Sequence, residues 1–85
     1  MPSAEQRTTD IVALAGGVMT DEVGVVTGEL TLRSDLRRGT YVLQVQYKGA
    51  AEWYHVTGSK AKLHSKDDLD AMHSQAVALL HRPEG

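Results

Sequence analysis

The 85-residue chain has no cysteine, no phenylalanine, only two prolines, and no apolar run near the ~20 residues that a membrane-spanning helix needs. The absence of cysteine excludes a disulfide framework and a thiolate metal site, and it favours a reducing compartment. We therefore expect a cytoplasmic protein that does not enter a membrane. One tryptophan and three tyrosines have to supply most of the bulky core volume.

The short length fits a single folded unit. A chain of this size buries only ~60% of the surface that its unfolded form exposes, so its stability is limited. Pairing with a second copy is one way to add buried area. We expect a flexible, polar N-terminal tail over residues 1–9 and one domain over residues 10–85.

The C-terminal segment has the pattern of an amphipathic helix, which we predict over about residues 66–82. Acidic residues come at its start, beside the positive end of the helix dipole, and Pro83 blocks continuation at its end. The Ser65 hydroxyl can accept a hydrogen bond from a backbone N–H near the start. One face, an arc of roughly 160°, is apolar apart from a single histidine. It holds Leu69, Met72, His73, Ala76, Val77, Leu79 and Leu80.

Alternating apolar and polar side chains predict strands ahead of this helix. The alternation is clear over residues 26–33, 41–48 and 52–57, with turn residues at 34–39 and a short loop at 48–51. The sequence therefore predicts an α+β fold, in which an antiparallel meander sheet of three to five strands packs against one C-terminal α-helix.

The segment 10–19 is compatible with two structures. Its Gly16-Gly17 pair fits either a hairpin turn between two strands or the stop of a short helix. A strand is favoured because Ile11 and Val12 are β-branched. A short first helix is the alternative.

The densest aromatic cluster is Trp53, Tyr54 and His55. Neighbours on a strand face opposite sides of a sheet, so Trp53 and Tyr54 cannot enter the same core. If Tyr54 packs under the helix, Trp53 and His55 lie on the other face, where an indole marks a partner surface. We predict that these three residues bind a protein partner or a second copy. The alternative is that the N-terminal segment or a second subunit covers this face.

Positive charge is concentrated in the middle of the chain. Residues 33–66 hold seven basic and two acidic residues, whereas the flanking segments are both acidic. Five of these cations are candidates for binding nucleic acid or another anionic ligand. They are Arg37, Arg38, Lys48, Lys60 and Lys62. Since the whole chain carries a net charge of −2, this is the alternative function, and solubilising exposed edges is the simpler role.

His73 lies in the middle of the apolar helix face, with Asp70 one turn before it. A carboxylate can orient an imidazole for catalysis, so this pair is a candidate for a minor enzymatic activity. No cysteine exists to act as its nucleophile, and no serine stands in a recognised nucleophile motif. We therefore expect a core or interface histidine bonded to a polar partner, because buried polar groups are normally hydrogen-bonded.

No motif indicates a metal or a cofactor. Nine and eight residues separate the last three histidines, so none shows the i,i+4 spacing that places two ligands on one helix face. Gly58-Ser59-Lys60 lacks the upstream glycine of a nucleotide-binding loop. We expect a small non-catalytic binding module without cofactor or metal.

The order of predicted elements is superficially similar to the second half of a double-stranded RNA-binding domain. That family grips phosphates with lysines at the start of its helix, where this chain has Asp67, Asp68 and Asp70. The same order resembles the small MbtH-like partners of peptide synthetases, but their tryptophan and proline motifs are missing here. Neither family is assigned, because order of elements alone is a fold-level analogy.

Overall fold

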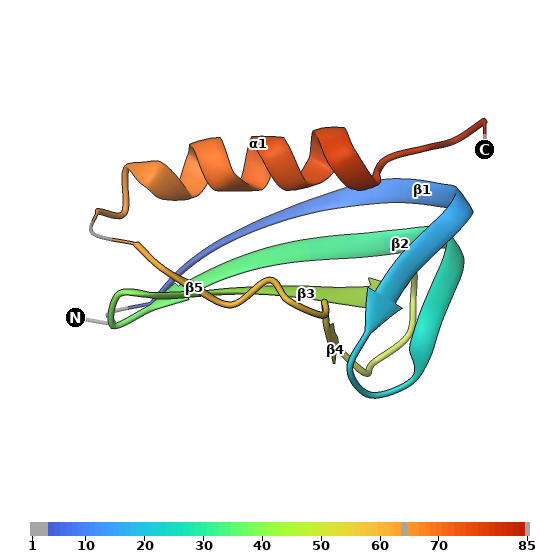
Figure 1. Cartoon of the computed structure of the whole chain (residues 1–85), viewed down its shortest axis with the longest axis horizontal. Helices are drawn as coiled ribbons and strands as arrows, with labels where there is room; N and C mark the ends of the chain where they lie inside the picture. Colours follow the sequence, from blue (N-terminus) through green and yellow to red (C-terminus); the bar gives the residue numbers. More distant parts are fainter. Residues whose placement is uncertain (1–3, 64, 85) are drawn as a thin grey trace.

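The computed structural model describes residues 4–63 and 65–84. Its elements are β1 (Ala4–Thr20), β2 (Gly24–Arg37), β3 (Thr40–Tyr47), β4 (Tyr54–His55), β5 (Ala61–Lys62) and α1 (Asp68–Leu80). The strands form one antiparallel sheet in the order β1-β2-β3-β4, and β5 pairs with β3 beside β4. The helix lies across one face of this sheet (Figure 1). The predicted α+β fold with an antiparallel sheet and one C-terminal helix is confirmed.

The first two strands form a long hairpin that bends in its middle. The pairing of β1 with β2 is regular as far as Ala13, opposite Gly28, and resumes at Val18, opposite Val26. The four residues 14–17 therefore face a single residue of β2, and the strand bulges and turns there (Figure 1). Gly17 has a φ of +60°, and a Cβ at this position would lie 2.5 Å from the Val26 carbonyl oxygen.

The prediction that Gly16-Gly17 forms a hairpin turn or a helix stop is therefore wrong. Both glycines have positive φ, but they serve a bulge inside one strand. Beyond the bulge, β1 reaches the residues that follow β4: Thr20 forms an antiparallel bridge with Val56, and the Thr57 N–H donates to the Met19 carbonyl at 3.0 Å. The sheet thus curls until its first strand meets the segment after β4.

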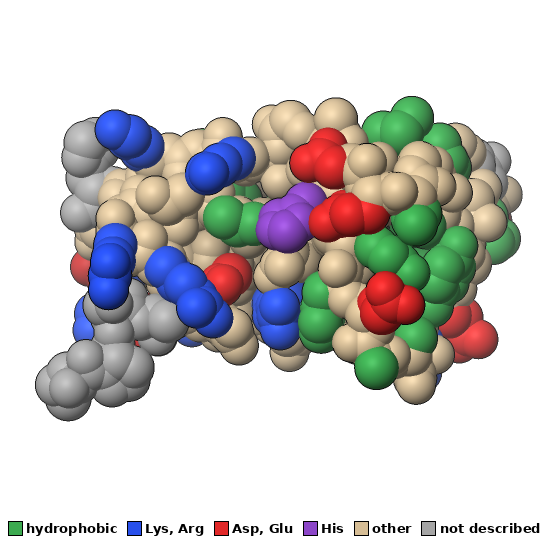
Figure 2. All heavy atoms as spheres, turned by 90° about the horizontal axis from the view of Figure 1, so that it is seen from below, with side chains coloured by type: hydrophobic (Ala, Val, Ile, Leu, Met, Phe, Trp, Pro, Cys, Tyr) green, Lys and Arg blue, Asp and Glu red, His purple; other side chains and the backbone are tan. Residues whose placement is uncertain are grey.

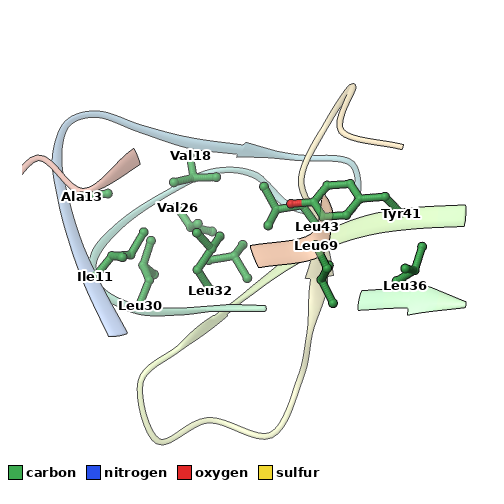
Figure 3. Close-up of a cluster of buried hydrophobic side chains, with 11 residues drawn as sticks. Ile11, Ala13, Val18, Val26, Leu30, Leu32, Leu36, Tyr41, Leu43 and Leu69 are labelled. Carbon is green, nitrogen blue, oxygen red and sulfur yellow. The ribbon is translucent and has the colours of Figure 1, made fainter. Parts of the chain in front are cut away.

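The core lies inside this curled sheet and under the helix. Its fully buried side chains are almost all aliphatic, with Val26, Leu30 and Leu32 from the sheet and Leu69 from α1 (Figure 3). Tyr41 is the one aromatic residue in the buried cluster. The expectation that aromatic residues supply most of the core volume is wrong, because closely spaced β-branched and leucine side chains from three strands fill the space instead.

Two strand boundaries differ from the predictions. Residues 4–9, expected in a flexible tail, belong to β1 and pair with the end of β2, whereas residues 1–3 lie outside the described residues. Residues 34–37, expected in a turn, continue β2 as far as a two-residue turn at Arg38-Gly39. Both turn residues have positive φ, 50° and 78°, as a type I′ hairpin requires.

The helix is two residues shorter at each end than the predicted 66–82. The Ser65 hydroxyl accepts a hydrogen bond from the Asp67 N–H at 3.1 Å, just ahead of the first turn. After the helix, Arg82 pairs with the edge of β1: its N–H donates to the Val12 carbonyl, and its carbonyl accepts from the Leu14 N–H. The chain end is thereby fixed along the sheet.

Candidate functional site

His73 belongs to a buried chain of hydrogen bonds between the helix and the sheet. Its side chain sits among apolar residues with 8% of the residue exposed. The Nε2 atom lies 2.8 Å from the Thr9 hydroxyl, and the Nδ1 atom lies 2.8 Å from the Ser34 hydroxyl, which also bonds to the Tyr41 hydroxyl. A neutral imidazole needs one donor and one acceptor, and hydroxyl groups can serve as either. Both ring nitrogens are therefore satisfied.

Asp70 does not orient this ring. Its carboxylate accepts from the Arg7 guanidinium at 2.6 Å, on the surface beside β1. Burial lowers the pKa of His73, repulsion from Arg7 lowers it further, and attraction to Asp70 opposes the shift. An imidazole closed off by the helix and held by two hydroxyls has no free nitrogen for a substrate. The geometry favours a structural role for His73, which joins α1 to β1 and β2.

The face of the sheet opposite the helix carries a row of polar side chains across three strands. Arg33 on β2 donates from Nε and Nη2 to the Gln44 Oε1 at 3.2 and 2.7 Å, and Gln44 on β3 stands opposite His55 on β4. The Arg33 guanidinium also lies over the Trp53 ring, 4.0 Å from its centroid. We call this surface the outer face. Tyr54 points the other way and packs against the core.

Glu22 holds His55 at two points. The His55 N–H donates to Oε1 at 2.8 Å, and Nδ1 lies 2.6 Å from Oε2. These bonds lower the pKa of Glu22, so the carboxylate is ionised and Nδ1 is the donor. Half of the His55 side chain is exposed. A ring fixed through Nδ1 leaves Nε2 as the position for a ligand.

The oriented histidine lines a pocket of about 420 Å³. The pocket is bounded by Asp21, Val42, His55, Val56, Gly58, Ser59 and Lys60. Asp21 is itself fixed, because its Oδ1 accepts from the Thr57 hydroxyl at 2.7 Å. The view of this side of the molecule shows basic side chains mostly on one half, apolar side chains mostly on the other, and between them a histidine with acidic side chains beside it (Figure 2). The pocket thus combines an apolar floor with groups of both charges.

Of the five predicted anion-binding cations, three lie near the end of β3 that begins at Thr40, whereas Lys48 lies at the other end. Lys60 lines the pocket, but Arg37 is paired with Asp35 at 3.0 Å and Lys48 with Asp10 at 3.7 Å. Lys48 follows one end of β3, whereas Arg38 precedes the other end. Lys62 on β5 stands opposite Thr40, near the same end of β3 as Arg38.

Sequence reasoning missed Glu22, which lies 33 residues before His55. Its turn becomes a neighbour of β4 only because the bulge bends β1 toward Val56. No local pattern signals that contact. By contrast, the opposite orientation of Trp53 and Tyr54 follows from strand alternation alone, as predicted.

Among residues 4–63 and 65–84, no three histidine or acidic side chains are placed to hold a metal ion. His64 lies outside these residues. Within the same part of the chain, no helix has the length and apolar character required to cross a bilayer.

A scan against protein-family models, a search of curated proteins and a search of solved structures each found no match to this chain.

Proposed function

We propose that this protein is a non-catalytic binding module that captures a segment of a protein partner on its outer face. The observation that supports this most strongly is the pocket beside β4, where Glu22 fixes the half-exposed His55 through two hydrogen bonds. A preformed concave site with an apolar floor and a few oriented polar groups is typical of ligand recognition. Trp53 and Arg33 extend this site along the same face.

Exposed apolar side chains lie at the hairpin end that carries Asp21 and Glu22. Met19 and Val25 are cross-strand neighbours at the end of the hairpin, and Val23 lies in the turn beside Glu22. Each of the three is about half exposed. Neighbouring exposed apolar side chains beside polar groups are characteristic of protein interaction surfaces. The segment bound here would place an apolar side chain on this hairpin end and a polar group against His55.

Selection from a random peptide library, followed by calorimetric titration of the selected peptides, tests the proposal. We expect Trp53→Ala and His55→Ala to weaken binding at least about tenfold each, equivalent to about 1.4 kcal/mol. Ser74→Ala is the control, because this residue is exposed on α1, which covers the other face of the sheet, and it does not line the pocket. Peptides that bind both outer-face variants as tightly as the unmodified protein would refute the proposal.

Nucleic-acid or anion binding through the central cations is the second candidate, and Lys60 at the pocket is the observation in its favour. It has less support, since Arg37 and Lys48 already face carboxylates. Binding of this kind weakens steeply as salt is added, because phosphate contacts release counterions. Oligonucleotide titrations at two salt concentrations distinguish the two candidates. A cytoplasmic location forms part of the same proposal and rests on the absence of cysteine.

A further inference from the structure

The first half of β1 forms an open edge of the sheet. Farther along this strand, the Val12 carbonyl and the Leu14 N–H both bond to Arg82, so the main-chain groups of these residues point away from β2. Main-chain direction alternates along an antiparallel strand, and the pairing of β1 with β2 is regular from residue 4 to residue 13. The N–H and C=O groups of Gln6, Thr8 and Asp10 therefore point outward as well.

These outward groups are almost all without a protein partner in the described part of the chain. The one contact is the Gln6 carbonyl, which accepts from the Arg7 side chain at 2.8 Å. The opposite edge of the sheet is covered by β4 and β5, and the later part of β1 is covered by Arg82. Natural proteins protect open edges with prolines, bulges, short strands or charged side chains, and of these devices residues 4–10 contain only charged side chains.

We propose that this edge pairs with the same edge of a second copy, in an antiparallel arrangement centred on Gln6. Each Gln6 then faces Gln6 of the second copy and exchanges two main-chain hydrogen bonds with it. Thr8 donates to the Ala4 carbonyl of the second copy. A two-fold axis through the centre closes the assembly as a dimer, so no further strand is added.

Charge on this edge favours a second copy over an unrelated strand. Glu5 and Arg7 project from the same face of β1 and lie 3.6 Å apart within one chain, where Arg7 also pairs with Asp70. In the proposed register, Glu5 of each copy stands directly opposite Arg7 of the other, and opposite charges in such cross-strand pairs stabilise a sheet. The edge is therefore complementary to itself. A chain of only 85 residues also gains buried area by this pairing.

Sedimentation analysis of two variants at the centre of the edge tests the proposal. Gln6→Pro removes an outward N–H without breaking the hydrogen bonds between β1 and β2, a position where proline is tolerated. Gln6→Ala keeps the N–H and is the matched control. We expect twice the chain mass of 9.2 kDa for the unmodified protein and Gln6→Ala, and 9.2 kDa for Gln6→Pro. Trp53→Ala, on the outer face, should remain dimeric.

Hydrogen exchange gives a readout that needs no variant. The outward Thr8 amide should exchange more slowly as protein concentration rises, because the dimer protects it. The Thr9 amide, bonded within the hairpin, should exchange at the same rate throughout. The proposal is overturned if the protein stays at 9.2 kDa at all concentrations. It is also overturned if the exchange rate of the Thr8 amide does not change with protein concentration. Peptide binding on the outer face is unaffected by either result.

Discussion

Replacing His73 by glutamine is expected to flatten the dependence of stability on pH below about 6.5. Burial lowers the pKa of His73 in the folded protein from its ordinary value of 6.5. Between the two pKa values the unfolded chain binds the proton and the folded chain does not, so the free energy of unfolding falls as pH falls. A single proton changes that free energy by at most about 1.4 kcal/mol per pH unit. Glutamine retains hydrogen-bonding groups beside Thr9 and Ser34 but does not titrate.

The assay is urea unfolding followed by Trp53 fluorescence at a series of pH values. The series runs from above 6.5 down toward 4.5, because Glu22, whose pKa is lowered from 4.5, destabilises the fold only as it is protonated near and below that value. His81→Gln is the control, since this ring is exposed and accepts a hydrogen bond from the Val12 N–H, a bond that a glutamine side chain can also accept. A domain of this size has roughly 4–13 kcal/mol of stability, so the slope is measurable. If His73→Gln keeps the full slope of the unfolding free energy against pH, the conclusion that His73 is buried and neutral in the folded protein is refuted.

Three further predictions concern the core and the backbone. Leu69→Ala should lower the free energy of unfolding by about 2–5 kcal/mol, whereas the exposed Leu79→Ala should change it by less than about 0.5 kcal/mol, as chemical denaturation will show. Gly17→Ala should prevent cooperative thermal unfolding because its Cβ overlaps a carbonyl oxygen, while Gly24→Ala, with open space around it, should remain folded. Ser34→Ala should reduce stability by about 1–3 kcal/mol in the same denaturation assay, because two buried groups lose their shared partner.

The elements that follow a local period were predictable from sequence. The helix and the strand Thr40–Tyr47 show clear spacing of apolar side chains, and the structure places both close to the predicted residues. The bulge at residues 14–17 was not predictable, because it depends on how Gly17 approaches the carbonyl of Val26 across the hairpin. Residue propensities alone predict a turn at two consecutive glycines.

The candidate site was also predictable only in part. Alternation along one strand was enough to separate Trp53 from Tyr54 and to place His55 beside Trp53. The contact between Glu22 and His55 depends on the curl of the sheet. The curl brings the turn between β1 and β2 next to β4, although these residues are far apart in the sequence. A polar partner for His73 was predicted, but its identity was not. Thr9, which bonds to the ring, lay in the segment predicted to be a flexible tail.

The most direct test of the outer face as a binding surface is a map of amide chemical shifts during titration with a selected peptide. If the outer face is the binding surface, the largest changes occur at Val42, His55 and the turn at Asp21-Glu22, with little change along α1. Changes confined to α1, or spread evenly over the protein, would contradict it.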